Sequence, residues 1–141
     1  MRILVVGDSC EDVFVYGKVN RLTPEAPVPV FNPTVTKTND GMARNVSNNV
    51  EALGVNISTI TNQNSIRKVR YVDDKSNQLV LRVDEHDYCD RIENILLSTI
   101  QNNECHIPFN GKRDFDAVII SDYDKGFLHE DDIKWICKNN D

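Results

Sequence analysis

The segment Ile3-Leu4-Val5-Val6-Gly7-Asp8-Ser9-Cys10-Glu11-Asp12 joins a continuous apolar run to a glycine and a polar stretch. A run of branched residues closed by a glycine is typical of a strand buried on both faces of a parallel sheet. Polar groups just past such a strand face a ligand crevice. The segment therefore predicts a strand end that presents Asp8 and Asp12 near a ligand crevice. The alternative is that both carboxylates cap local turns, as Asp often does.

A second stretch is long enough to make a comparison with known families specific. It is Arg21-Leu22-Thr23-Pro24-Glu25-Ala26-Pro27-Val28-Pro29-Val30. Together they resemble the opening of the ribokinase-like (PfkB) carbohydrate kinases, most closely the D-glycero-D-manno-heptose 7-phosphate kinases. Those openings run Gly-Asp-x-x-x-Asp and then Arg-x-x-Pro-Glu-Ala-Pro-Val-Pro. The resemblance implies an α/β fold with a ribokinase-like three-layer core, partial in this chain, and a small β lid. It also implies that the Asp12 carboxylate hydrogen-bonds sugar hydroxyls.

Composition narrows the class of protein. The chain has 141 residues, a length that fits one domain, and a net charge of -6 with a pI near 5.0. An acidic balance argues against nucleic acid or an anionic membrane as a partner, because both require a positive surface. The apolar runs are too short to span a bilayer and the N-terminus lacks a signal-peptide layout, which predicts a cytoplasmic protein. The cysteines and histidines show no metal-ligand spacing, so no metal site is expected.

Periodicity and turn residues outline the rest of the chain. The sequence first predicts an extended proline-rich segment through Pro33 and a turn at 39–41. A helix follows, with Val46, Val50 and Leu53 on its apolar face and Gly54 at its end. The remaining predicted elements are a strand at 55–60, a hairpin at 67–72 and 79–83, a helix from about Asp90, a strand at 117–120 and a last helix. This order favours a three-layer α/β core with an accessory β element. We expect one partial domain over 1–141, with lid elements at about 16–38 and 66–84 inserted in the core.

The run Asp40-Gly41-Met42-Ala43-Arg44-Asn45 opens the first predicted helix and resembles the Gly-Gly-x-x-x-Asn stretch of the ribokinase-like kinases. The resemblance implies that Gly41 lets the backbone approach the sugar and that Asn45 contacts its hydroxyls. A helix N-terminus offers unpaired N–H groups, and an Asn amide donates and accepts at once. Two residues depart from the pattern, because Met42 stands where a second glycine is common and Arg44 where a small residue is. Without the family pattern, the sequence favours an exposed helix residue at Asn45.

Lys68 and Arg70 form a candidate phosphate clamp. They lie two apart, so on a strand they point to the same face. The segments that contain them and Arg82 resemble the Lys-x-Arg and Asn-Gln-x-x-x-Arg-x-Asp segments of the same family. The alternative for Lys68 and Arg70 is a solvated edge strand that carries charge against aggregation. For Arg82, a place on the lid surface is as consistent as a ligand contact.

The run Ser121-Asp122-Tyr123-Asp124-Lys125-Gly126 follows the second buried strand. It resembles the Ser-Asp-Tyr-x-Lys-Gly motif of the heptose kinases, and its place at a carboxyl strand end favours the crevice. Asp122 and Lys125 are therefore candidate substrate-binding residues. The alternative is an ordinary polar loop.

Part of the family pattern is missing. The resemblance implies an ATP site, a Gly-Ala-Gly-Asp anion hole and a catalytic aspartate in a C-terminal half, but no Gly-x-Gly-Asp or P-loop occurs in this sequence. We therefore assign no catalytic residue, and we expect ATP and Mg²⁺ to bind only if a complete kinase site is assembled. A further shortening is expected at Thr61-Asn62-Gln63-Asn64, which replaces a longer stretch. The chain is expected to be a reduced relative or a fragment.

These features predict a small sugar phosphate as ligand and leave the role of the chain open. One hypothesis is a sugar-kinase relative that transfers a phosphoryl group from ATP only if the missing half is supplied. A second is a non-catalytic sugar-phosphate-binding module, and a third is an interaction protein that dimerises through the hairpin 67–84. An uncovered sheet exposes apolar surface and strand edge, which predicts a homodimer through the lid or a completing partner chain.

Overall fold

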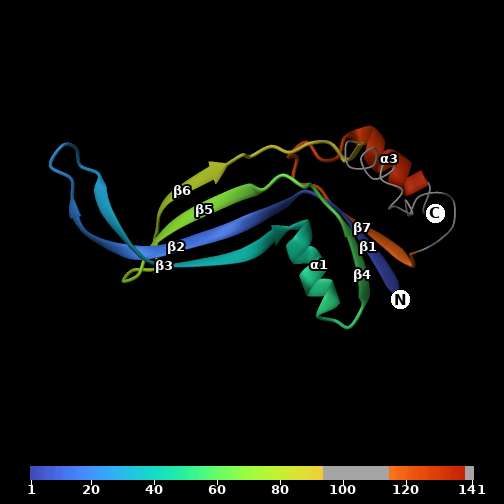
Figure 1. Ribbon diagram of the computed structural model, residues 1–141, viewed down its shortest axis with the longest axis horizontal. Helices are drawn as coiled ribbons and strands as arrows, with labels where there is room; N and C mark the ends of the chain where they lie inside the picture. Colours follow the sequence, from blue (N-terminus) through green and yellow to red (C-terminus); the bar gives the residue numbers. More distant parts are fainter. Residues whose placement is uncertain (94–114, 139–141) are drawn as a thin grey trace.

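The computed structural model describes residues 1–93 and 115–138, which form two sheets joined end to end (Figure 1). Both helices lie beside the smaller sheet, which we call the core sheet. The larger sheet, the lid sheet, extends away from it and narrows to a protruding hairpin formed by the blue ends of β2 and β3. The molecule is therefore elongated, with its helices at one end.

The core sheet is parallel and has the strand order β4-β1-β7. Its strands are β1 (Arg2–Gly7), β4 (Asn56–Ile60) and β7 (Ala117–Ser121). Within β1, Leu4, Val5 and Val6 are at most 1% exposed, as expected for the predicted doubly buried strand. Gly7 pairs with Ser121, and a Cβ at position 7 would lie 1.9 Å from the Ser121 carbonyl oxygen. This close approach requires glycine at the end of β1.

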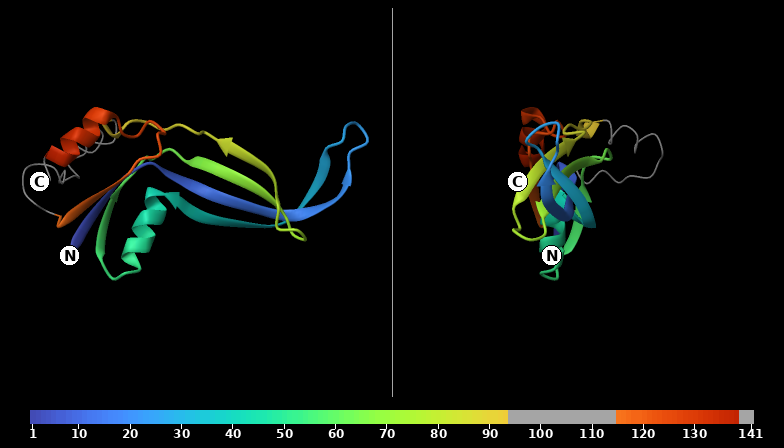
Figure 2. Two further views of the ribbon diagram at one scale, coloured as in Figure 1. Left: turned by 180° about the vertical axis from the view of Figure 1, so that it is seen from behind. Right: turned by 90° about the vertical axis from the view of Figure 1, so that its left-hand side faces the viewer.

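The helices α1 (Ala43–Glu51) and α3 (Glu130–Lys138) cover opposite faces of the core sheet and lie on either side of it in the left view of Figure 2. On the α3 side, Leu4 and Val6 belong to an apolar cluster that includes Phe127 and Ile136. On the α1 side, Ala43 is fully buried. The layers are thus helix, sheet and helix, which is the three-layer core that the sequence predicted.

The predicted apolar face of the first helix is only partly correct. Its buried residues are Ala43 and Ser47, whereas Val46 and Val50 are half-buried. Leu53 is 80% exposed, because α1 ends at Glu51 and leaves Leu53 outside the helix. Gly54 does end the helical segment as predicted, since it adopts a φ of 79° and donates its N–H to the Glu51 carbonyl at 2.8 Å.

The lid sheet has the strand order β3-β2-β5-β6. Its strands are β2 (Ser9–Leu22), β3 (Pro29–Met42), β5 (Ile66–Asp73) and β6 (Leu79–Glu85). The β5–β6 pair is antiparallel, which confirms the predicted hairpin, while β2 runs antiparallel to β3 and parallel to β5.

Two predicted irregular segments are strands instead. The polar stretch that contains Glu11 and Asp12 was placed past the end of the first strand, with local turns as the alternative, and a turn was predicted at 39–41. Instead, β2 and β3 pair there from Ser9 opposite Met42 onward. Pairing over this length satisfies the backbone donors and acceptors that a turn would otherwise organise, so it overrides the local preference of Asn, Asp and Gly.

Several expectations fall outside the described residues. These are most of the helix predicted from Asp90, the loop that follows it, Cys105 and His106. Neither helix described here has the length and hydropathy that crossing a bilayer requires. Over residues 1–93 and 115–138, His, Cys, Asp and Glu side chains form no group of three or more that is placed to hold a metal ion.

Candidate functional site

One face of the lid sheet collects most of the predicted ligand-binding residues. Cross-strand partners share a face, and Asp12 pairs with Asn39 on β3 and with Lys68 on β5, which in turn pairs with Asp84 on β6. We call this the site face. The next row along it contains Phe14 on β2 and three cations on the neighbouring strands, Lys37, Arg70 and Arg82.

Arg70 is fixed against Asp12 and Phe14. Its Nη1 donates to Asp12 Oδ1 at 2.5 Å, and its guanidinium carbon lies 5.2 Å from the Phe14 ring centroid. Asp12 and Arg70 are each about a quarter exposed, so the pair is accessible from solvent. Lys68 and Arg70 do share a face as predicted. The edge-strand alternative is wrong, because β5 lies between β2 and β6.

Gly41 is the position where the Asp12 carboxylate lies against bare backbone. A Cβ at position 41 would lie 2.7 Å from Asp12 Oδ2 and 2.5 Å from Cys10 Sγ. Any larger residue would therefore push the carboxylate or the thiol aside. The need for glycine arises here from side-chain crowding, not from a left-handed backbone.

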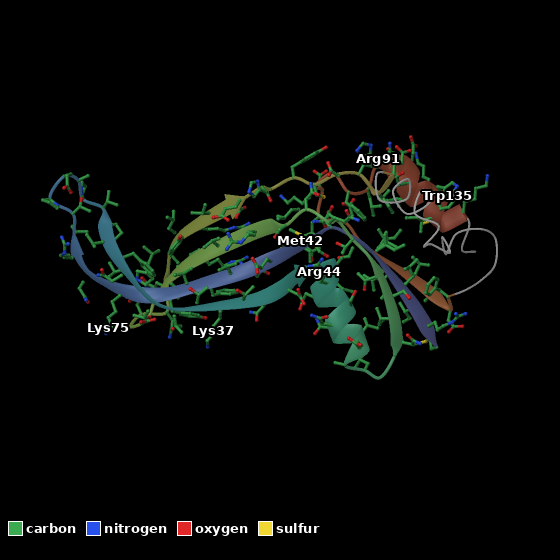
Figure 3. The ribbon with its side chains drawn as sticks, viewed as in Figure 1. Lys37, Met42, Arg44, Lys75, Arg91 and Trp135 are labelled. Atoms are coloured by element: carbon green, nitrogen blue, oxygen red, sulfur yellow. The ribbon has the colours of Figure 1, made fainter. Side chains whose placement is uncertain are left out.

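The start of α1 is tied to the end of β1. The N–H of Ala43 donates to the Asp8 carbonyl at 2.9 Å, and the N–H of Arg44 donates to Ser9 Oγ at 3.1 Å. Met42 precedes the helix with a φ of 56°, a conformation that favours glycine. Figure 3 shows Met42 and Arg44 at this junction between β3 and α1. The departure from the family pattern at Met42 thus falls on a strained backbone.

Asn45 and Asp12 line the same pocket. This pocket has a volume of about 550 Å³ and lies between the first turns of α1 and the site face. Its lining residues are Asp12, Phe14, Thr38, Asn39, Asp40, Asn45 and Asn48. The lining is rich in amides and carboxylates, which donate to and accept from hydroxyl groups. The structure therefore brings Asp12, Gly41, Asn45 and Arg70 together.

A second pocket, of about 260 Å³, shares the wall formed by residues 38–40. Arg44 and Glu11 line it together with the short connection that leads to β5, residues 62–66. Glu11 is ion-paired with Arg67 at 2.8 Å, and the hydrogen bond from Arg67 to Glu11 is the largest cause that raises the pKa of Arg67. Arg44 therefore adds a cation beside the predicted site without entering the pocket that holds Asn45.

Asp122 and Lys125 lie on the loop after β7 and do not line either of these two pockets. Lys125 Nζ donates to Asp87 at 2.7 Å, and this hydrogen bond is the main cause that raises the pKa of Lys125. Asp122 accepts the N–H of Asp124 at 2.9 Å.

The charges of Lys68 and Lys125 both act on Asp84, whose pKa is lowered chiefly by its hydrogen bond from Arg82. The loop therefore lies within electrostatic reach of the site face.

Two residues make long-range hydrogen bonds that the sequence did not predict. Asn62 is 3% exposed and joins the short connection to β2, since its side chain accepts the Ser9 N–H at 2.7 Å and donates to the Ser9 carbonyl at 3.1 Å. The alternative considered for Asp8, a cap of a local turn, is wrong, because its carboxylate accepts N–H groups from a loop more than 110 residues away. No local pattern indicates either long-range contact.

Comparison with known proteins identifies relatives of this chain. No family model matches the chain. It is 30% identical over 154 aligned positions to the bifunctional protein HldE of Helicobacter acinonychis, which covers 90% of this chain and 32% of that protein. The HldE protein of Desulfatibacillum aliphaticivorans is also 30% identical and covers 97% of this chain and 33% of its own length. The chain thus spans about a third of the length of the curated relatives it matches.

A solved structure shows the fold. A putative phosphofructokinase from Staphylococcus aureus aligns with 99% of this chain and 51% of its own length, with a TM-score of 0.55 and 11% identity. The fold is therefore the α/β, ribokinase-like arrangement that the sequence predicted, represented in part. The aligned HldE stretch is also longer than the part of this chain that it covers.

Proposed function

We propose that this chain is a relative of the ribokinase-like carbohydrate kinases that retains the sugar-phosphate-binding side of a heptose 7-phosphate kinase-type site. The observation that carries the proposal is the convergence of Asp12 from β2 and Asn45 from α1 on one polar pocket. The alignment with HldE over 90% of the chain supports the choice of a sugar ligand. In this proposal the ligand is a small sugar phosphate.

Each site residue has a proposed role. Asp12 accepts hydrogen bonds from sugar hydroxyls, Asn45 donates and accepts, and Gly41 leaves room for both the carboxylate and the ligand. Lys68 and Arg70 bind the phosphate. Among the described residues the Lys68 ammonium has no hydrogen bond or ion pair, so its charge is available to an anion. Asp122 and Lys125 complete the site from the core edge.

Phosphoryl transfer requires more than these residues provide. The sequence contains no Gly-x-Gly-Asp motif and no P-loop, and phosphoryl transfer depends on positioning and charge stabilisation around the phosphates. We therefore propose that ATP and Mg²⁺ bind, and that transfer occurs, only when a nucleotide-binding segment from outside these 141 residues completes the site. The protein would work in the cytoplasm, where ATP and sugar phosphates are found.

A second candidate role is association through the lid sheet. Strand β6 is at the edge of that sheet, and its residues Leu79 and Leu81 are 56% and 54% exposed. An edge strand with exposed apolar side chains is a template for pairing with another chain. Sedimentation velocity over a range of concentrations distinguishes the two roles, because a dimerisation module associates without ligand.

Calorimetric titration with heptose 7-phosphate and a panel of other sugar phosphates tests the main proposal. We expect saturable binding that weakens about tenfold or more in Asp12→Asn and Asn45→Ala, because each change removes hydrogen bonds to the ligand. Asn56→Ala, an exposed amide at the start of β4, is the matched control and should bind like the unaltered chain. Absence of binding to every sugar phosphate, or equal affinity in all variants, would overturn the proposal.

A further inference from the structure

The side chain of Asp8 is fully buried, and it faces the loop that follows β7. Asp8 Oδ2 accepts the N–H groups of Tyr123 at 2.7 Å and Lys125 at 3.4 Å, and Oδ1 accepts that of Phe127 at 3.3 Å. The Cys89 thiol also donates to Oδ1 at 3.8 Å. A buried carboxylate is costly unless it is hydrogen-bonded, and these donors offset that cost.

The loop is shaped to receive an anion. The N–H groups of every second residue, 123, 125 and 127, converge on the Asp8 carboxylate. The residues between them, Asp124 and Gly126, adopt left-handed φ values of 57° and 96°. Backbone N–H groups arranged in this way form a concavity that binds negative charge. In this protein the concavity is filled by the carboxylate of Asp8, the residue between β1 and β2.

The same residue also holds the start of helix α1. The Asp8 carbonyl accepts the N–H of Ala43, and the hydroxyl of the next residue, Ser9, accepts the N–H of Arg44. The next residue of this first helical turn is Asn45, which lines the 550 Å³ pocket. Asp8 therefore lies between the helix that carries Asn45 and the loop that carries Lys125.

We propose that Asp8 is a positioning residue that sets the loop 122–127 and the first turn of α1 in a fixed relation. This inference rests on the proposed sugar-phosphate site and extends it. Asp8 does not touch the ligand, because it is fully buried. It acts through Lys125 and Asn45, which it places on two sides of the site.

Hydrogen exchange on the ligand-free protein tests the positioning directly. In Asp8→Asn the carboxamide presents an NH₂ group to backbone donors, so we expect faster exchange both in the loop 122–127 and in residues 43–46. Ile136→Ala is the matched control, since it destabilises the apolar cluster from α3 and leaves the Asp8 carboxylate unchanged. The inference is overturned if the loop keeps its protection, or if the loop loosens and α1 does not.

Affinity measurements then separate positioning from a loss of stability. At a temperature where all variants are folded, we expect Asp8→Asn to bind the sugar phosphate about tenfold more weakly and Ile136→Ala to bind it within about twofold of the unaltered chain. In Asp8→Ala, sodium formate should restore affinity by filling the concavity, whereas sodium chloride should not. Equal losses in Asp8→Asn and Ile136→Ala would contradict a positioning role. If the unaltered chain binds no sugar phosphate, the proposed function fails, and the exchange experiment still decides whether Asp8 couples loop and helix.

Discussion

The core sheet and the lid sheet of this protein are stabilised differently. In the core sheet, helices cover both faces, and β1 is almost completely removed from water. In the lid sheet, the edge strand β6 exposes Leu79 and Leu81, and rows of charged residues cross the strands, such as the ion-paired Glu11, Arg67 and Glu85. Apolar burial contributes far more to stability than exposed ion pairs do. We infer that the core sheet supplies most of the stability and the lid sheet most of the recognition.

The largest expected effect contrasts one leucine from each sheet. Leu4→Ala should lower the free energy of unfolding by about 2–5 kcal/mol, because Leu4 is 1% exposed and its truncation leaves a cavity. Leu81→Ala removes the same atoms from a residue that is 54% exposed, and it should change stability by no more than about 0.5 kcal/mol. Urea unfolding followed by circular dichroism measures both. Similar losses in the two variants would show that the lid sheet is as well packed as the core.

The reactivity of two cysteine thiols, Cys89 near the core sheet and Cys10 in the lid sheet, tests the same comparison. Burial, with the nearby Asp8 carboxylate, raises the pKa of Cys89 to about 12 from the ordinary value of 9.0. Because the thiolate is the reactive form, alkylation of Cys89 at pH 8 should be about a thousandfold slower in the folded chain than in urea. Cys10, at the base of β2, also has a raised pKa, mainly from burial, but Lys68 and Arg70 oppose the shift. We therefore expect Cys10 to react faster than Cys89.

Mass spectrometry of alkylated peptides measures each thiol, with the exposed Cys137 as the reactive control. The raised pKa of Cys89 also fixes the sign of a pH effect. Only the unfolded chain loses the proton between about pH 9 and 12, so stability should fall as the pH rises through that range and should not depend on this thiol below it. Alkylation of Cys89 as fast as Cys137 would contradict its burial.

A smaller effect is expected at Met42, where the two sheets join. Its φ of 56° and ψ of -128° cost an L-residue about 1–3 kcal/mol, while its side chain is 7% exposed and packs in the apolar cluster. Met42→Ala loses the packing and keeps the strain, whereas Met42→Gly loses both. We therefore expect the glycine variant to be more stable than the alanine variant by about 1 kcal/mol, although alanine is usually the more stable of the two in regular structure. Thermal unfolding of the pair decides it, and a more stable alanine variant would remove the argument for strain.

The core sheet was easier to predict from the sequence than the lid sheet. The apolar runs at 3–6 and 117–120 correspond to β1 and β7, because a strand covered on both faces leaves a continuous hydrophobic signal. The hairpin formed by β5 and β6 was also predictable, since the polar turn at 73–77 separates two β-rich segments. These elements are specified by neighbouring residues.

Other features depend on contacts that are distant in sequence. Asn39, Asp40 and Gly41 have the composition of a turn, yet they pair with β2 over residues 10–12. The candidate site shows the same limit, because the pairing of Asp12 with Arg70 joins residues 58 apart. The sequence indicates that the two residues are polar and suited to a ligand. Only the folded sheet shows that they bind each other.

The contacts of Asp8 also affect the order in which parts of the chain can fold during synthesis. Its partner Tyr123 lies 115 residues further along the chain, and at typical translation rates those donors are made roughly 6–23 s after Asp8 itself. The strand β1 likewise lacks its neighbour β7 during that interval. The lid strands β2, β3, β5 and β6 are all complete by residue 85. The sheet with the weaker packing can therefore form on the ribosome first, and the first strand of the chain is among the last to be enclosed.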